Sequence, residues 1–470
     1  MLKVLNKKSL SFLALSLSIS VLSFGCTVAD DMHMSLSTNS SQKDYSDSIL
    51  IKLSGDKAVI DGVKVEEYDY TWHCDPSVSH DEVENAPAEY YTGNKPDTEA
   101  AAYIDHELYY YPKVDDSLFT LVNYDGEQEW AYYYNDGEND EYIFATLPRF
   151  GDGFSAHMMH TPQEAAENKV LHITKAGSYV LRGNWNGQIK VDLGEDAFDD
   201  ESAVVTLILD GIDIVCSVAP GLIFYNVYEC DNQWKNRENY DVNVDTTSAG
   251  ANIILADNSL NHISGSNVYR MLKTKYKNED STDEIKPQKK MRKNDGALYS
   301  YMSINIDGED VGNGQLVVDS GFEGIDSELH MTINGGSVII SSMDDGINVN
   351  EDHVSVLSFT GGQITINAAL GEEGDGVDSN GFIRINGGYV AINGIRVPDS
   401  ALDSEDGIYY ESGQILIDGE EQHYNSGDVF KETKDTQGRF DIEELGKGKR
   451  PEDGMMPPKD RGEQHNDKQF

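Results

Sequence analysis

Residues 374–394 read GDGVDSNGFIRINGGYVAING, a Gly-Asp-Gly turn followed by two strand-like segments that a Gly-Gly pair separates. Related segments precede it at 295–308 (DGALYSYMSINIDG), 323–336 (EGIDSELHMTINGG) and 345–362 (DGINVNEDHVSVLSFTGG), and a weaker copy begins at Ser400. The second strand-like segment of each step follows a marker glycine, and these glycines are Gly314, Gly336, Gly362, Gly388 and Gly413. The chain therefore carries an internal repeat with a period of 22–26 residues.

Two short strands in each step of this length are typical of one coil of a parallel β-helix. Apolar side chains alternate with polar ones after each marker glycine, which predicts one inward and one outward face. The side chains expected to point inward form stacked pairs, namely Val338 and Ile340, Ile364 and Ile366, Val390 and Ile392, and Ile415 and Ile417. We therefore predict an all-β parallel β-helix, or solenoid, with a continuous aliphatic core.

Composition divides the rest of the chain. The stretch between 66 and 168 lacks the repeat and is rich in Tyr, so we expect an insertion packed on the coils. A basic run at 270–293 indicates a protruding loop. The predicted order is a signal peptide at 1–26, a polar linker at 27–48, a first coil at 49–65, the Tyr-rich insertion at 66–168, the main β-helix at 169–430 and a disordered polar tail at 431–470.

The N-terminal residues combine a basic start with a short apolar stretch, which is typical of a secretory signal. Gly25-Cys26 resembles a lipoprotein cleavage site, which favours a lipid on Cys26 and a location on the outside of a bacterial cell. Cleavage after Ala29 by ordinary signal peptidase is the alternative. Apart from Cys26, the cysteines that remain after either cut are Cys74, Cys216 and Cys230. Cys216 and Cys230 lie on neighbouring strand-like segments and form the favoured disulfide pair.

The formal net charge is −47, because 83 acidic residues outnumber 36 basic ones. Nucleic-acid binding is excluded on this ground, since phosphate contacts need Lys and Arg. Such acidity is consistent with simple solubility or with the capture of calcium ions.

The repeats resemble the core motifs of bacterial carbohydrate-binding-domain proteins. The resemblance rests on DGALYSYMSINIDG, SMDDGINVNEDHVSVLSFTGGQITINA and GEEGDGVDSNGFIRINGGYV, together with IKLSGDKAVIDGVKV at 51–65 and ITKAGSYVLRGNWNGQI at 173–189, and covers 169–418 well. It implies a secreted, calcium-containing, right-handed parallel β-helix that is related in fold to pectate lyases. It also implies binding of plant cell-wall polysaccharide, pectic or cellulosic, without establishing lyase activity.

Two columns of acidic and amide side chains recur beside the repeat glycines. The first comprises Asp295, Glu323, Asp345 and Asp375, and the second comprises Leu298, Asp326, Asn348, Asp378 and Asp403. Stacked coils would bring these oxygens together, as calcium requires, although Asp and Asn also favour tight turns for local reasons. We predict calcium ligands among Glu323, Asp326, Asp345, Asn348, Asp375, Asp378 and Asp403, with sites between the later coils because Leu298 interrupts the second column.

Sugar contacts are predicted from aromatic and cationic side chains. Tyr110 and Tyr133 lie in the clusters Tyr109–Tyr111 and Tyr132–Tyr134, although burial of one Tyr per cluster would also account for them. Arg384 is expected to face outward between Ile383 and Ile385, either as a salt-bridge partner, as a contact to sugar or as the base of a lyase.

The sequence favours a non-catalytic, calcium-binding surface protein that binds plant cell-wall polysaccharide. A calcium-dependent, pectate-lyase-like enzyme is the first alternative. A structural or adhesive surface protein without a sugar ligand is the second.

Overall fold

The computed structural model describes residues 45–65, 67–72, 91–92, 102–107, 119–124, 127–135, 141–146, 168–231, 242–265, 271–275, 287–290, 294, 296–370, 374–395 and 399–434. Every described residue belongs to one compact unit, Tyr45–Phe470. In these ranges no helix combines the length and the apolar character that a membrane crossing requires.

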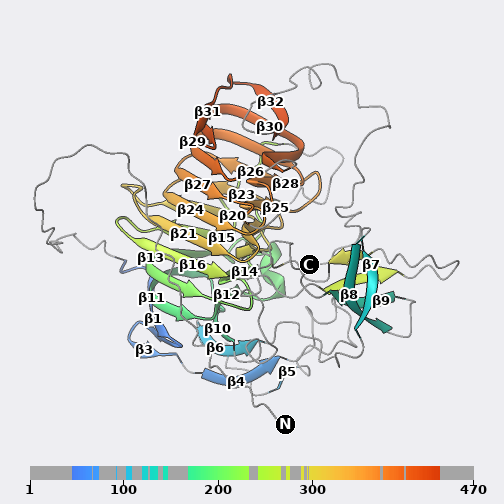
Figure 1. Ribbon diagram of the computed structural model, residues 1–470. Helices are drawn as coiled ribbons and strands as arrows, with labels where there is room; N and C mark the ends of the chain where they lie inside the picture. Colours follow the sequence, from blue (N-terminus) through green and yellow to red (C-terminus); the bar gives the residue numbers. More distant parts are fainter. Residues whose placement is uncertain are drawn as a thin grey trace, which may run out of the picture. The chain divides into compact units, whose positions relative to one another are not determined.

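Most of the described strands form three walls around one core (Figure 1). Wall A contains β10 (Lys169–Ile173), β12 (Gln188–Asp192), β14 (Leu222–Asn226), β19 (Gly296–Ser300), β22 (Glu323–Ser327), β25 (Ile347–Val349) and β28 (Val377–Ser379). Wall B contains β15 (Ala251–Leu255), β20 (Ile304–Gly308), β23 (Met331–Ile333) and β26 (Val356–Phe359). Wall C contains β16 (Leu260–Gly265), β21 (Gln315–Ser320), β24 (Ser337–Ser342) and β27 (Gln363–Asn367).

Longer strands connect the walls. β1 (Ile49–Gly55), β11 (Gly177–Asn186), β13 (Val205–Val215) and β29 (Phe382–Asn393) run from wall B into wall C, and β30 (Ser400–Ile417) contributes to all three walls. One 3-10 helix, Glu195–Asp199, follows β12. Each strand pairs in parallel with its equivalent one turn later, as β22 with β25, β23 with β26 and β24 with β27 show.

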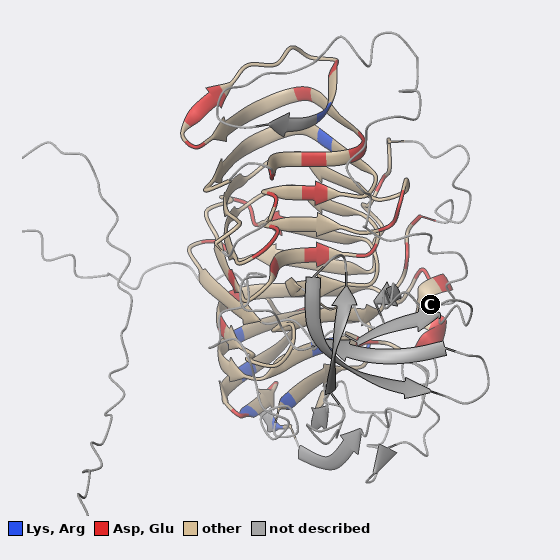
Figure 2. Cartoon of the chain, turned by 45° about the vertical axis from the view of Figure 1, so that its right-hand side comes forward, with Lys and Arg blue, Asp and Glu red and all other residues tan. Residues whose placement is uncertain are grey.

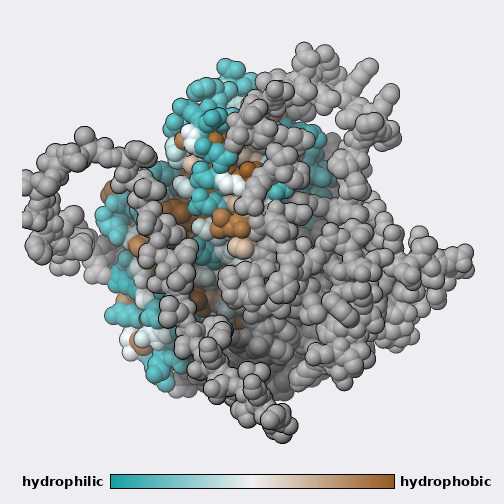
Figure 3. All heavy atoms as spheres, in the orientation of Figure 1, coloured by the Kyte–Doolittle hydropathy of each residue, from teal (hydrophilic) through white to brown (hydrophobic). Residues whose placement is uncertain are grey.

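Stacked aliphatic side chains fill the interior. On wall C, Leu316, Val338, Ile364, Val390 and Ile415 are register partners on successive strands, and all five are buried. The inward pairs predicted from the alternation after the marker glycines are therefore confirmed. Burial of such a column is the main stabilising term, since no single turn could remove its apolar surface from water alone. On the face that Figure 3 shows, the described surface is largely hydrophilic with smaller apolar patches.

The predicted fold class needs correction. Its all-β character is confirmed, since the described residues contain no α-helix. The prediction of a right-handed parallel β-helix with two strands in each coil is wrong as it was made. The described strands form one mixed, 27-stranded sheet that curls around a single core and has three strands in each full turn. The error arose because wall A strands of three to five residues, such as Ile347–Val349, are too short to show alternation.

The Tyr-rich and basic segments also contribute strands. β4 (Glu67–Trp72), β5 (Tyr91–Thr92) and β6 (Ala102–Glu107) belong to the large sheet, although the sequence assigned them to an insertion. The segment 270–293 was predicted as a loop, yet it contains two strands of a separate, five-stranded sheet. That sheet comprises β7 (Phe119–Tyr124), β8 (Glu127–Asn135), β9 (Glu141–Thr146), β17 (Met271–Lys275) and β18 (Pro287–Lys290).

Antiparallel strands pair with the large sheet near both of its ends. β2 (Lys57–Ile60) pairs with β1 and is followed by β3 (Val63–Lys64), while β6 pairs antiparallel with β10. At the other end, β31 (Glu420–Gln422) and β32 (Asp428–Lys434) both pair antiparallel with β30. The parallel part of the sheet therefore stops at strands of opposite direction.

The predicted disulfide does not form. Cys216 is buried and Cys230 half-buried, and neither is part of a disulfide. The Cys216 thiol donates a hydrogen bond to Asn168 Oδ1, with a separation of 3.5 Å. Cys74 lies outside the described residues.

A histidine on wall C predicts a pH effect on stability. His262 Nδ1 lies 2.7 Å from Asp213 Oδ1 and its Nε2 lies 3.1 Å from Asp319 Oδ2. The hydrogen bond to Asp319 is the main cause that raises the pKa of His262 above 6.5. The imidazolium therefore stabilises the folded state at low pH, and this contribution is lost as the pH rises through the raised pKa. We expect His262→Gln to destabilise the protein at about pH 5.5 more than at about pH 8.5.

Chemical denaturation at the two pH values would measure the difference. Lys190→Gln, which removes the cation of an ion pair with Asp192 on wall A, is a control that should show no comparable pH dependence in this range. An equal loss of stability for His262→Gln at both pH values would contradict the prediction.

Candidate metal centre on wall A

The second predicted column exists as a set of direct neighbours. Asp326 on β22, Asn348 on β25, Asp378 on β28 and Asp403 on β30 are successive register partners of parallel strands. Each follows a core residue, such as Ile347 before Asn348, so these polar side chains lie on the opposite side of the strand. The fifth member is Tyr299, the partner of Asp326, and the predicted member Leu298 instead pairs with Ile325 in the core.

The first predicted column is held by the backbone. Gly324 N donates to the carbonyl oxygen of Asp345, and Gly346 N donates to that of Asp375, each at 2.9 Å. The carboxylates join this ladder, because Asp375 N donates to Asp345 Oδ1 at 2.7 Å and Ser400 N donates to Asp375 Oδ1 at 2.6 Å. Glu323, Asp345 and Asp375 are all buried. Asp295, the predicted first member, lies outside the described residues.

The glycines beside these acids are required by packing against the core. A Cβ on Gly346 would lie 2.2 Å from Ile366 Cγ2 and 2.5 Å from the carbonyl oxygen of Gly376. The sequence suggested that Gly376 permits a turn, but its backbone continues the wall A ladder and Ile392 Cγ2 would lie 2.4 Å from an added Cβ. The Asp-Gly pair thus places a carboxylate where wall A comes closest to the isoleucines of wall C.

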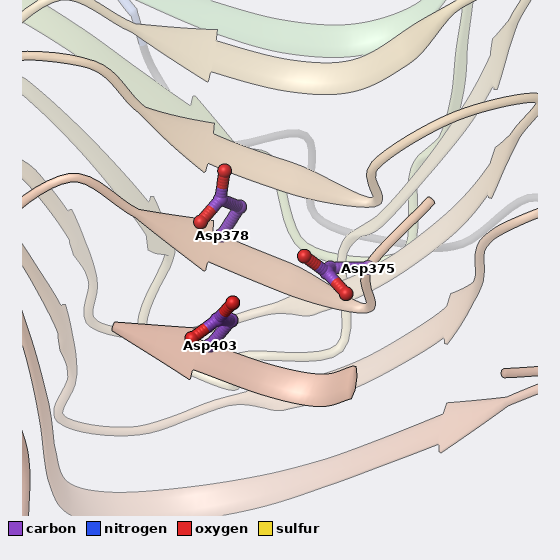
Figure 4. A group of neighbouring side chains, drawn as sticks. All are labelled: Asp375, Asp378 and Asp403. Atoms are coloured by element: carbon purple, nitrogen blue, oxygen red, sulfur yellow. The ribbon is translucent and has the colours of Figure 1, made fainter. Parts of the chain in front are cut away.

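Three carboxylates converge in the last turns. One ligand atom from each of Asp375, Asp378 and Asp403 can be chosen so that all lie within 4.8 Å of one another. Figure 4 shows the carboxylates of Asp378 and Asp403 stacked on neighbouring strands, with Asp375 near the start of the strand that carries Asp378. Asp375 and Asp378 are buried, and Asp403 is half-buried. The structure therefore brings together three of the seven predicted ligands as a possible ion site.

Charge interactions link this cluster to acidic residues of the preceding turns. Burial, followed by the negative charges of Asp344, Asp378, Asp375 and Glu323, holds the pKa of Asp345 well above its ordinary value. Like charges that are buried together disfavour ionisation unless a cation neutralises them. Figure 2 shows acidic positions stacked over the later turns, whereas Lys and Arg occur mainly in the earlier ones.

Two buried oxygens in this cluster have no hydrogen-bond donor among the described residues. They are Glu323 Oε2 and Asn348 Oδ1, although Asn348 Nδ2 donates to Glu323 Oε1 at 3.1 Å. Asn350 Nδ2 also donates to Asp326 Oδ1 at 2.5 Å. Buried polar atoms without a partner are rare, and carboxylate and amide oxygens are the ligands that calcium prefers. The residues present therefore fit a hard divalent cation.

A second buried polar network was not predicted. Glu229 accepts hydrogen bonds from Ser303 N at 2.7 Å and from Ser303 Oγ at 2.8 Å, and burial raises its pKa. His330 Nδ1 accepts a hydrogen bond from Val356 N at 3.0 Å, which leaves Nε2 as the protonated nitrogen facing Asp231. These residues come from distant parts of the sequence without a shared repeat position, so no sequence pattern could have grouped them.

The predicted sugar contacts lie away from this cluster or outside the described residues. Arg384 lies on β29 in wall B, between its register partners Ser358 and Tyr409. Tyr110 lies outside the described residues. The backbone of Tyr133 pairs with Phe144 in the five-stranded sheet, and its side chain is not among the described parts.

Comparison with known proteins places these features in a family. The model of the carbohydrate-binding domain-containing protein family matches residues 167–443, which is more than half of the chain. A solved structure, the gadolinium derivative of the polysaccharide lyase-like protein from C. thermocellum, is 20% identical in sequence. The match covers 60% of this chain and 92% of that chain with a TM-score of 0.34. No curated protein matches the chain significantly.

Proposed function

The chain belongs to the carbohydrate-binding domain-containing protein family, and on that premise we propose that it is a calcium-containing protein that binds plant cell-wall polysaccharide without cleaving it. The observation that carries the calcium part is the convergence of Asp375, Asp378 and Asp403, with two partnerless buried oxygens nearby. Family membership supports the polysaccharide part, and the pectic or cellulosic type belongs to the proposal.

Calcium would act by neutralising the column and by linking successive turns. Asp375, Asp378 and Asp403 would supply carboxylate oxygens, with Asn348, Asp345, Asp326 and Glu323 extending the set toward the earlier turns. A bound calcium ion supplies two positive charges and accepts six to eight oxygen ligands. The protein's own part is to hold these oxygens on neighbouring strands, since each comes from a backbone position that the parallel ladder fixes.

The net charge explains why a cation would matter for an acidic polysaccharide. At −47, the chain would repel a polymer of uronic acids unless cations lay between the two. Calcium on the protein lowers that repulsion, and a neutral glucan would not need this help. The pectic and cellulosic forms of the proposal therefore differ in whether binding depends on calcium.

A non-catalytic role is favoured by the position of the one base candidate that the sequence offered. A calcium-dependent lyase needs its base and its cation on the same sugar residue. Arg384 lies on wall B, whereas the acidic cluster lies on wall A. We also propose a location on the outside of the cell, with the N-terminal segment as signal and Cys26 as the site of a lipid anchor.

Affinity electrophoresis would test polysaccharide binding. We expect the protein to migrate more slowly in a native gel that contains polygalacturonate and calcium than in a gel without polymer, and a chelator to remove most of this retardation. Asp378→Asn should reduce the calcium effect, because it removes one of the three converging charges. A gel with a soluble cellulose derivative distinguishes the neutral from the acidic ligand class.

Equal mobility in all gels would rule out the proposed function. Formation of an unsaturated product from polygalacturonate, followed by its ultraviolet absorbance, would rule out the non-catalytic part alone.

A further inference from the structure

The guanidinium of Arg384 lacks a partner on an acidic protein. Within the described parts of the chain, Arg384 forms no ion pair and no hydrogen bond through its side chain. By contrast, Arg182, also on wall B, contacts Asp210 with an Nη2–Oδ2 distance of 2.5 Å. Since the chain has 83 acidic residues, a half-exposed arginine that none of them pairs with is unexpected. The sequence favoured a salt bridge for Arg384, and the structure does not contain one among the described residues.

The neighbours of Arg384 are neutral and suited to a sugar. Its register partners on adjacent strands are Ser358 and Tyr409. Phe382 and Tyr409 are half-exposed, with ring centroids 6.1 Å apart and planes inclined by 53°. Aromatic faces pack against the C–H faces of sugar rings, and a tyrosine hydroxyl such as that of Tyr409 can hydrogen-bond to sugar hydroxyls.

The charge of Arg384 selects among polysaccharides. A guanidinium presents its N–H donors in a planar fork that matches the two oxygens of a carboxylate. A neutral glucan offers no such group, whereas each residue of a uronic-acid polymer carries one. Because the surrounding chain is strongly negative, an anionic ligand would be held here only where a local cation outweighs the general repulsion.

We propose that the surface formed by Phe382, Arg384 and Tyr409 on wall B binds the carboxylate of a uronic-acid residue in an acidic polysaccharide. This inference rests on the proposed polysaccharide-binding function and specifies its ligand class. The contact is made by the protein directly, so it does not require the metal centre on wall A.

Binding of oligogalacturonate to the full chain, measured by isothermal titration calorimetry in calcium-containing buffer, tests the proposal. We expect Arg384→Gln to weaken binding about ten- to a hundredfold, as the loss of a charge-assisted bidentate contact implies. Arg384→Lys should retain part of the affinity, because it keeps the charge and loses the fork. Arg182→Gln is the matched control, since that arginine already contacts a carboxylate of the protein, and should leave affinity unchanged.

The outcomes separate this inference from the proposed function. If the wild-type chain binds neither oligogalacturonate nor a neutral glucan, the proposed function fails. If the wild type binds oligogalacturonate and Arg384→Gln binds equally well, only the wall B proposal fails. It also fails if the substitution weakens binding of methyl-esterified oligogalacturonate as much, because the contact is then not to a carboxylate. Thermal melting of each variant shows that the fold is retained, and Tyr409→Phe provides a second test should Arg384→Gln unfold.

Discussion

Removal of calcium from the protein is expected to lower its melting temperature by several degrees. A ligand that binds only the folded state stabilises it in proportion to the logarithm of its concentration over the dissociation constant, which gives about 2.7 kcal/mol at a hundredfold excess. Asp375, Asp378 and Asp403 come together only when β28 pairs with β30, so the unfolded chain offers no equivalent site. Differential scanning calorimetry in calcium and in chelator would measure the shift.

The substitution Asp345→Asn should have opposite effects on stability in calcium and in chelator. Asp345→Asn keeps the oxygen that accepts the hydrogen bond from Asp375 N and removes one buried negative charge. Without calcium, this relieves repulsion from Asp344, Asp375 and Asp378, so the variant should be more stable than the wild type. With calcium, the variant lacks part of the attraction, so it should be less stable. A change in the sign of the stability difference between variant and wild type would distinguish an ion site from acidic residues that merely form turns.

Magnesium and a half-buried acid outside wall A provide the controls. Magnesium demands a smaller, octahedral set of oxygens, so it should restore less stability than calcium at equal concentration. Asp210→Asn, on wall B beside Arg182, should show the same effect in calcium and in chelator. An identical melting temperature in both buffers would contradict calcium binding in the ladder.

Gly346→Ala is expected to destabilise the protein by about 1–3 kcal/mol, the usual cost of overpacking a core. The new methyl group would meet Ile366 Cγ2 at 2.2 Å and the Gly376 carbonyl oxygen at 2.5 Å, and neither can move without disturbing the adjacent turn. Chemical denaturation gives the loss. Combination with Ile366→Ala should cost less than the sum of the two single substitutions, because the second removes the obstructing group.

The last turn contains an internal comparison. Ala401 occupies the position in β30 that Gly324, Gly346 and Gly376 occupy in the preceding turns, and it is buried. Among the described strands, no further parallel strand of wall A follows β30. Ser337→Ala, at a half-buried outward position of wall C, should change stability little and serves as the experimental control. Additive effects of Gly346→Ala and Ile366→Ala would show that the packing argument is incorrect.

The sequence predicted the parts of the fold that repeat regularly. Alternation after each marker glycine identified the wall C core, and the acidic column was found because Asp326, Asn348 and Asp378 recur at equivalent positions. It did not identify wall A as a set of strands, since segments such as Val377–Ser379 are too short for a period-two pattern. Nor did it align the first copy correctly, because a shift of one residue puts Tyr299, rather than Leu298, in the column.

The candidate site was harder to predict in its details than in its residue types. The Asp-Gly pairs indicated oxygen ligands, but their glycines were interpreted as turn residues. The structure shows instead that a side chain at these positions would collide with Ile340, Ile366 and Ile392 on wall C. The lack of a partner for Arg384 depends on which acids lie within reach in space, and a sequence with so many carboxylates favours the opposite conclusion. Glu229 and His330 do not occupy recurring positions in the repeat, so the sequence did not predict that they belong to one network.

The antiparallel strands at the ends of the large sheet bear on how copies of the chain meet. A stack of parallel strands exposes, at its last strand, the same backbone donors and acceptors that join its own turns, so one molecule could serve as the template for the next. Here β31 and β32 occupy that edge of β30, and their direction differs from that of the strand a second copy would offer. Loss of residues 420–434 would thus expose this edge of β30 to pairing with a strand of another chain.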